Sequence, residues 1–219
     1  MKKILFLLTL PFLGFGQDWP NLARFSEENM SLSLEKGRVV LMGNSITEGW
    51  PKAMPDFFKG KPIVNRGISG QTTPQMLIRF RQDVVDLEPE IVVILAGTND
   101  LAGNTGPSTV EMIADNIFSM AEIAAANGIK VVLCSVLPVF DYPWKTGLEP
   151  AGKILELNRM LKNFAEKHGH YYLDYHARMA DDRNGLPKNL ASDEVHPTLE
   201  GYQIMAEMLT EMLNKITGR

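Results

Sequence analysis

The sequence predicts an α/β fold of three layers, in which helices cover both faces of one five-stranded parallel β-sheet. Short apolar runs rich in β-branched residues alternate along the chain with longer stretches of helical period, which is typical of such sheets. No internal repeat or low-complexity linker interrupts the 219 residues. We therefore expect residues 17–219 to form a single domain.

The apolar runs predict five strands, each short enough for a strand that is buried on both faces. These strands are expected at residues 38–43, 62–65, 91–96, 129–135 and 170–174.

Four long helices are expected around these strands. The first starts near Pro74, after Thr73, and must end by Pro89, and the others span 109–127, 150–168 and 198–216. Ser108 and Glu111 have the spacing of a capping box before the second helix, and a glycine directly follows both the second and the third.

Two connections, 136–149 and 177–192, are longer than the fold requires. In parallel α/β sheets, ligands bind beyond the carboxyl ends of the strands, where both connections emerge. The first carries Phe140, Tyr142 and Trp144, which could form a platform for a sugar ring or an acyl chain. Ordinary packing of a lid is the alternative explanation of these aromatic residues.

Residues 1–16 have the pattern of a secretory signal peptide, to be cleaved after Gly16. Lys2 and Lys3 precede an apolar run at 4–13, and small residues follow at Gly14 and Gly16. The run of about ten residues is too short to span a bilayer, which takes about 20. We expect an exported protein, periplasmic or extracellular, without stable membrane insertion; an uncleaved interfacial anchor is the alternative.

Composition excludes several partners and cofactors. The 26 acidic residues exceed the 22 basic ones, for a net charge of −4, which argues against a nucleic acid partner. Cys134 is the single cysteine, so an internal disulfide and a cysteine-based zinc site are both excluded. No metal or other cofactor is expected, and the oligomeric state is left open.

Ser45 is placed where a nucleophile could act. It follows the first predicted strand and Gly43, at a turn toward a helix whose free N–H groups could stabilise an oxyanion. The segment is not the G-x-S-x-G elbow of α/β-hydrolases, because position 47 is threonine. Taken alone, Ser45 could simply cap the helix.

Asp193 and His196 could supply the other half of such a site. A carboxylate three residues before a histidine can hold the imidazole in one tautomer and stabilise its protonated form. In the alternative interpretation, His196 is a surface residue and Asp193 caps the last helix.

Four blocks resemble, in the right order, those of the SGNH hydrolases, also called the GDSL esterase/lipase superfamily. They are Gly43-Asn44-Ser45-Ile46-Thr47, Gly67 within Asn65-Arg66-Gly67-Ile68-Ser69-Gly70, Gly97-Thr98-Asn99-Asp100, and Asp193-x-x-His196. The resemblance covers about residues 38–217 and implies a flavodoxin-like three-layer fold.

The resemblance implies that Ser45 is the nucleophile, His196 the general base and Asp193 the orienting carboxylate. It further implies an oxyanion hole made by the backbone N–H groups of Ser45 and Gly67 and the side-chain amide of Asn99. Glycine lets the backbone approach a substrate closely, although Gly67 and Asn99 would also serve as turn residues. Asn44 replaces the family's usual aspartate, which removes one negative charge and leaves the pH optimum and the leaving-group preference open.

These observations together predict a secreted serine esterase. The expected reaction is hydrolysis of short-chain, most plausibly acetyl, oxygen esters on carbohydrate through an acyl-enzyme on Ser45. Three alternatives are kept: a lysophospholipase or thioesterase with the same three residues, a non-hydrolytic acyltransferase, and a catalytically silent carbohydrate-binding module.

Overall fold

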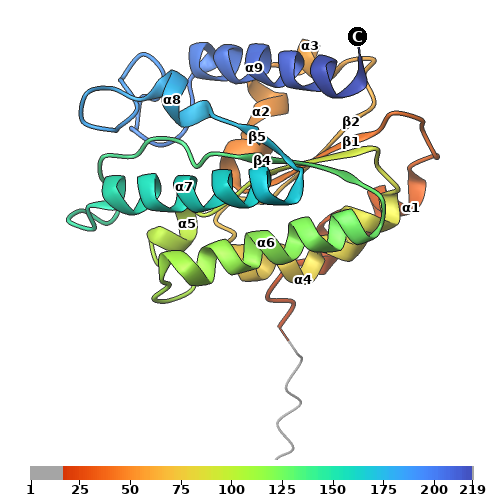
Figure 1. Cartoon of the computed structure of the whole chain (residues 1–219), viewed down its shortest axis with the longest axis horizontal. Coiled ribbons are helices and arrows are strands. Elements are labelled where there is room, and N and C mark those ends of the chain that lie inside the picture. Colours follow the sequence, from red (N-terminus) through yellow and green to blue (C-terminus); the bar gives the residue numbers. More distant parts are fainter. Residues whose placement is uncertain (1–16, 219) are drawn as a thin grey trace, which may run out of the picture.

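A five-stranded parallel sheet lies between two layers of helices in the computed structural model, which describes residues 17–218 (Figure 1). The strands follow the order β2-β1-β3-β4-β5, and the predicted three-layer α/β fold is confirmed. The signal peptide expected at residues 1–16 lies outside the described residues.

The strands coincide closely with the five apolar runs. They are β1 (Val39–Gly43), β2 (Ile63–Gly67), β3 (Ile91–Leu95), β4 (Lys130–Cys134) and β5 (Tyr171–Leu173). Only β2 differs noticeably, since it continues past residue 65 so that Arg66 and Gly67 pair with Met42 and Gly43. A charged residue in a buried strand concealed this extension in the sequence.

Helices cover both faces of the sheet. One face carries α4 (Thr73–Asp83), α6 (Val110–Ala126) and α7 (Pro150–His168); the other carries α2 (Ser45–Ala53), α3 (Pro55–Phe58), α8 (Tyr175–Met179) and α9 (Leu199–Thr217). Val40 and Met42 pack on the first face, whereas Val39 and Leu41 pack on the second. Burial of both faces explains why the inner strands β1 and β3 contain no polar side chain.

The ends of two helices differ from the predictions. Helix α4 begins at Thr73, one residue before Pro74, and stops at Asp83 because a 3₁₀ turn, Val85–Leu87, follows it. The capping box expected from Ser108 is wrong, since the Thr109 side chain accepts a hydrogen bond from the Met112 N–H instead.

Residues 18–31 form an N-terminal arm that the sequence analysis did not predict. It contains a 3₁₀ turn (Leu22–Phe25) and α1 (Ser26–Ser31). Side-chain amides of Gln75 and Gln71 donate to the carbonyls of Trp19 and Pro20, at 2.8 and 2.7 Å. The arm is thereby fixed beside the loop that follows β2. Across residues 17–218, no helix combines the length and apolarity required to cross a membrane.

Candidate active site

Ser45 stands at the turn between β1 and α2. Asn44 precedes the helix, and its Oδ1 accepts a hydrogen bond of 3.1 Å from the Ile46 N–H. A Cβ atom at Gly43 would lie 2.0 Å from Thr47 Oγ1, so only glycine fits before this turn. Asn44, and not Ser45, is therefore the residue that caps α2, and it does so without a negative charge.

The fold brings together Ser45, His196 and Asp193, although 151 residues separate the first two. Ser45 Oγ lies 2.9 Å from His196 Nε2, and His196 Nδ1 lies 2.7 Å from Asp193 Oδ2. The side chains of His196 and Asp193 are 40% and 43% exposed, so solvent and substrate can reach the cluster. Because a carboxylate can only accept, Nδ1 carries the proton of a neutral ring and Nε2 accepts from the serine hydroxyl.

Asp193 is itself held by the turn that it starts. Its Oδ1 accepts from the backbone N–H groups of Val195 and His196, at 3.0 and 2.7 Å. Partial burial raises the pKa of Asp193, but these two contacts and the His196 ring outweigh it and lower the pKa below its usual value. The group is therefore a carboxylate when it orients the imidazole.

Helix α9 ties the histidine turn to the serine turn. Thr198 caps this helix through the Gly201 N–H, and its own N–H donates to the Leu190 carbonyl at 2.7 Å. One turn later, the Tyr202 hydroxyl donates to the Ile46 carbonyl at 2.8 Å. This buried contact joins α9 to the first turn of α2 and so fixes the distance between Ser45 and His196.

Gly67 ends β2 against the backbone of α2. A Cβ atom here would lie 2.2 Å from the Glu48 nitrogen, so glycine is required by packing as well as by any approach of substrate. The Gly67 N–H donates to Asn65 Oδ1 at 2.9 Å. Asn65 in turn donates to the Thr47 carbonyl at 2.6 Å.

Asn99 follows β3 in the short helix α5 (Thr98–Leu101). It is buried, and its Nδ2 donates to the Gln71 carbonyl at 2.9 Å; an amide NH₂ has a second hydrogen to offer. The adjacent Asp100 carboxylate accepts from the Thr73 N–H and hydroxyl, and burial raises its pKa to about 6. Ser45, Gly67 and Asn99 thus stand at or just after the carboxyl ends of β1, β2 and β3, which are neighbours in the sheet.

The three aromatic residues of the 136–149 loop do not form one platform, which corrects that expectation. Tyr142 is fully buried, and its hydroxyl donates to the Thr98 carbonyl at 2.8 Å. Trp144 is half exposed, with its ring 6.2 Å from the His196 ring and 5.3 Å from that of Tyr142. Phe140 is also half exposed, beneath the Arg183 guanidinium at 4.9 Å. Of the three, Trp144 contacts the site and Tyr142 anchors the loop beneath it.

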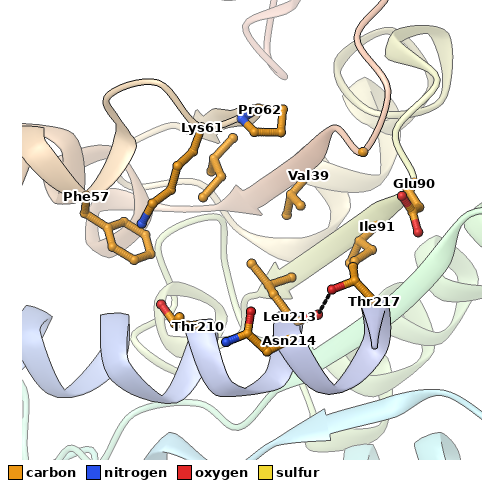
Figure 2. Close-up of a pocket in the computed structure, with 12 residues that line it drawn as sticks. Val39, Phe57, Lys61, Pro62, Glu90, Ile91, Thr210, Leu213, Asn214 and Thr217 are labelled. Atoms are coloured by element: carbon orange, nitrogen blue, oxygen red, sulfur yellow. Dashed lines mark hydrogen bonds between the residues drawn. The ribbon is translucent and has the colours of Figure 1, made fainter. Parts of the chain in front are cut away.

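Two hollows lined mostly by polar residues lie on either side of the cluster formed by Ser45, His196 and Asp193. One is lined by Asp141, Tyr142, Pro143, Thr146, Lys188, Ser192, Asp193 and Glu194. The other lies between the N-terminal arm and the loops after Gly67 and Asn99, and is lined by Asp18, Trp19, Asn21, Ile68, Ser69, Gly70, Gln71, Gln75, Asn104 and Thr105. A third, more apolar pocket lies at the opposite edge of the sheet, where the strands begin; its lining includes Val39, Phe57 and Leu213 together with Lys61 and Glu90 (Figure 2).

Sequence reasoning missed Asn65, Gln71 and Trp19 around this site. Asn65 and Gln71 act through hydrogen bonds that involve main-chain groups, and Trp19 lines a hollow. Neither kind of role has a signature in the local spacing of residues. Asn65 and Gln71 did flank Gly67 in a polar segment, which was the available signal. Within the described residues, no group of three or more histidine, cysteine or acidic side chains could hold a metal ion.

A family model and a solved structure that resemble this chain both belong to acylhydrolases. The model of the GDSL-like lipase/acylhydrolase family matches residues 41–204. The crystal structure of a candidate acylhydrolase from Bacteroides fragilis is 43% identical, with a TM-score of 0.89 over 92% of this chain and 99% of that one.

Two curated relatives are longer than this chain. An uncharacterised lipoprotein of Bacillus subtilis is 37% identical over 82 residues, which are 36% of this chain and 34% of the relative. An acetylxylan esterase of Xylanibacter ruminicola is 24% identical over 209 residues, covering 78% of this chain and 42% of the relative. The chain thus spans less than half the length of either.

Proposed function

The chain belongs to the GDSL-like lipase/acylhydrolase family, and we propose that it is an exported serine esterase that removes acetyl and other short acyl groups from oxygen esters of carbohydrate. The observation that carries the reaction class is the continuous hydrogen-bonded series from Ser45 through His196 to Asp193. It has the geometry that a hydroxyl nucleophile and its base require.

In the proposed mechanism, Ser45 Oγ attacks the ester carbonyl while His196 Nε2 takes its proton. Asp193 keeps the imidazole in place and stabilises its protonated form. The negative oxygen of the tetrahedral intermediate accepts from the N–H groups of Ser45 and Gly67 and from Asn99 Nδ2. Collapse of the intermediate expels the alcohol, which receives the proton from His196 and leaves an acyl group on Ser45.

Water then completes the reaction by the same route. His196 takes a proton from the water that attacks the acyl-enzyme, and returns it to Ser45 as the acid leaves. In each tetrahedral intermediate, the substrate oxygen replaces Asn65 Oδ1 as the acceptor of the Gly67 N–H, while the Gly67 peptide keeps its direction. Loss of that contact costs little if the new acceptor carries a full negative charge.

The surroundings of Ser45 favour a small acyl group on a polar alcohol. Both flanking hollows are lined mainly by polar residues, and the apolar pocket of Figure 2 lies at the opposite edge of the sheet. Trp144 beside His196 and Trp19 at the second hollow present half-exposed aromatic faces, on which sugar rings can stack. The name of the Xylanibacter ruminicola relative, an acetylxylan esterase, is consistent with this substrate class.

Export is part of the same proposal. It is supported by the charged, apolar and small-residue pattern of residues 1–16, and a polymeric carbohydrate ester would be met outside the cytoplasm.

An acyl-length series tests the substrate. The purified protein should hydrolyse chromogenic acetate and propionate esters with a kcat/KM at least about tenfold above that for octanoate and longer chains, because the two hollows beside the site are lined mostly by polar residues. It should also release acetate from an acetylated polysaccharide, as measured by acetate assay. The Ser45→Ala protein is the matched control for spontaneous hydrolysis.

Each alternative gives its own outcome in that experiment. A preference for long acyl chains or thioesters would overturn the proposal in favour of a lysophospholipase or thioesterase. Acyl transfer to an added sugar in preference to water would indicate a transferase. Absence of turnover together with absence of Ser45 labelling by a fluorophosphonate would leave only a binding module.

In acid, the activity of the protein should depend on the binding of a single proton. Below neutral pH, kcat/KM for an acetate ester should fall with a limiting slope of about one, because a protonated His196 cannot accept the serine proton. The lowered pKa of Asp193 keeps that carboxylate ionised over this range of pH, so it adds no second proton. Initial rates between about pH 5 and pH 8 measure this, and a flat profile would refute the assignment. A slope of two would show that Asp100, whose pKa is raised by burial to about 6, affects the rate as well.

A further inference from the structure

Arg79 of α4 is a fully buried arginine that lies behind the proposed oxyanion hole. Its Nη2 donates to two main-chain carbonyls, those of Arg66 at 2.9 Å and Gly43 at 3.1 Å. Its Nε donates to Gln71 Oε1 at 2.6 Å, and its Nη1 pairs with Asp83 at 3.0 Å. One guanidinium thus connects the ends of β1 and β2 with the loop that follows β2.

The Arg66 carbonyl belongs to the same peptide group as the Gly67 N–H. The bond is trans, as are all described peptide bonds, so the carbonyl and the N–H point in opposite directions. Fixing the carbonyl against Arg79 therefore fixes the direction in which the Gly67 N–H points. A charge-assisted bond to the carbonyl also polarises the peptide and strengthens its N–H as a donor.

Gln71 extends the same support to Asn99. Its side chain accepts from Arg79, while its main-chain carbonyl accepts from Asn99 Nδ2 at 2.9 Å. The first amide hydrogen of Asn99 is held in this way, and the second is left in a fixed direction. The Gly43 carbonyl, the fourth acceptor, ends the strand that delivers Ser45.

We propose that Arg79 is a positioning residue that aligns the oxyanion hole, holding the Gly67 peptide directly and the Asn99 amide through Gln71. The inference rests on the proposed esterase function, since it assigns a role toward that reaction. Arg79 is fully buried behind the donors, so it acts on them and not on substrate. Lysine cannot replace it, because a single ammonium cannot reach four acceptors in the geometry of a planar fork.

The sequence held an indication of this role. Arg79 and Asp83 fall at i and i+4 on the face of α4 that buries Met76 and Phe80. A charged pair on an apolar helix face is costly unless it is fully hydrogen-bonded, so its presence points to a specific task.

The test compares Arg79→Lys with Arg38→Lys. Arg38 is the control because it is also buried and donates to the carbonyls of Leu87 and Ser33, but at the edge of the sheet away from Ser45. On a chromogenic acetate, Arg79→Lys should lower kcat by about ten- to a hundredfold, while KM changes less than about threefold and the acid limb stays in place. The inhibition constant of a trifluoromethyl ketone, which forms an oxyanion on the serine, should rise in the same proportion.

A direct readout separates positioning from stability. In ¹⁵N-labelled protein, the amide resonance of Gly67 should move in Arg79→Lys and stay in place in Arg38→Lys, even where both variants lose a similar number of degrees in Tm. If Arg79→Lys does not fold, Gln71→Leu removes the side chain through which Arg79 holds the Gln71 segment, and it leaves the Arg79 contacts with Asp83 and the Arg66 carbonyl intact. A smaller fall in kcat, of about three- to tenfold, is then expected, because only the support of Asn99 is weakened.

The outcomes also distinguish this inference from the function on which it rests. A wild-type protein that hydrolyses no ester would refute the esterase proposal. A wild-type protein that is active, with kcat and ketone inhibition in Arg79→Lys within about twofold of those in Arg38→Lys, would refute the positioning role alone.

Discussion

Replacing Ser45 with alanine is expected to lower turnover of an acetate ester by about four to six orders of magnitude. The variant lacks the oxygen that forms the acyl-enzyme, while the oxyanion donors and the histidine are unchanged. His196→Ala should cost about as much, because without a base the serine hydroxyl 2.9 Å away is a weak nucleophile. The double variant should lose little more, since the two side chains act as one unit.

Asp193→Asn should be less damaging than either, because an amide can still accept the two backbone N–H groups of its turn. It would, however, lose the carboxylate that fixes the imidazole tautomer, and a loss of about 10⁴-fold is expected. Turnover rates of the purified variants, corrected for contaminating host esterase, show which of the three substitutions costs most.

Matched controls are available for each side chain. Ser119 on α6 and His168 at the end of α7 lie away from the site, so Ser119→Ala and His168→Ala should retain wild-type turnover. A Ser45→Ala protein with more than about one per cent of wild-type turnover would defeat the assignment of the nucleophile.

The sheet was predictable because its strands are buried on both faces. Runs such as that of β3, Ile91–Leu95, contain only apolar residues, which is typical of parallel strands covered by helices on both faces. Strand β2 was predicted short because Arg66 interrupts its apolar run. That guanidinium is buried against Asn29 and the Glu28 carboxylate of the N-terminal arm, and a local pattern contains no sign of partners so far along the chain.

The candidate site likewise has a part that local sequence could predict and a part that depends on distant contacts. The spacing of Asp193 and His196 is local, and a three-residue turn alone brings their side chains together. Their approach to Ser45 depends on the packing of α9 on α2, where Tyr202 meets Ile46 across 156 residues. Only the resemblance to a family anticipated that His196 and Ser45 would meet, and nothing in the sequence indicated the Tyr202 contact. The orientation of Tyr142 could not be predicted, because an aromatic residue in a long loop faces inward or outward according to distant partners, here Thr98.

Replacing Asn99 with alanine should lower kcat by about 10²- to 10³-fold and change KM much less. The amide is aimed at an oxygen that becomes negative only in the transition state, so its removal weakens transition-state binding more than substrate binding. Asn99 is the most direct test of the oxyanion hole, because the other two proposed donors are backbone N–H groups. Gly67 cannot be altered instead, since a Cβ there would strike the α2 backbone at 2.2 Å.

Steady-state kinetics on a chromogenic acetate, with active serine counted by fluorophosphonate labelling, provide the measurement. Asn127→Ala is the control, because the side chain of that asparagine donates to the Ile123 carbonyl at the far end of α6. If Asn99→Ala raised KM and left kcat unchanged, the amide would bind substrate and transition state equally, and the oxyanion role would be refuted. A wild-type kcat/KM would show instead that the Gln71 contact, and not catalysis, is the reason for an asparagine at this position.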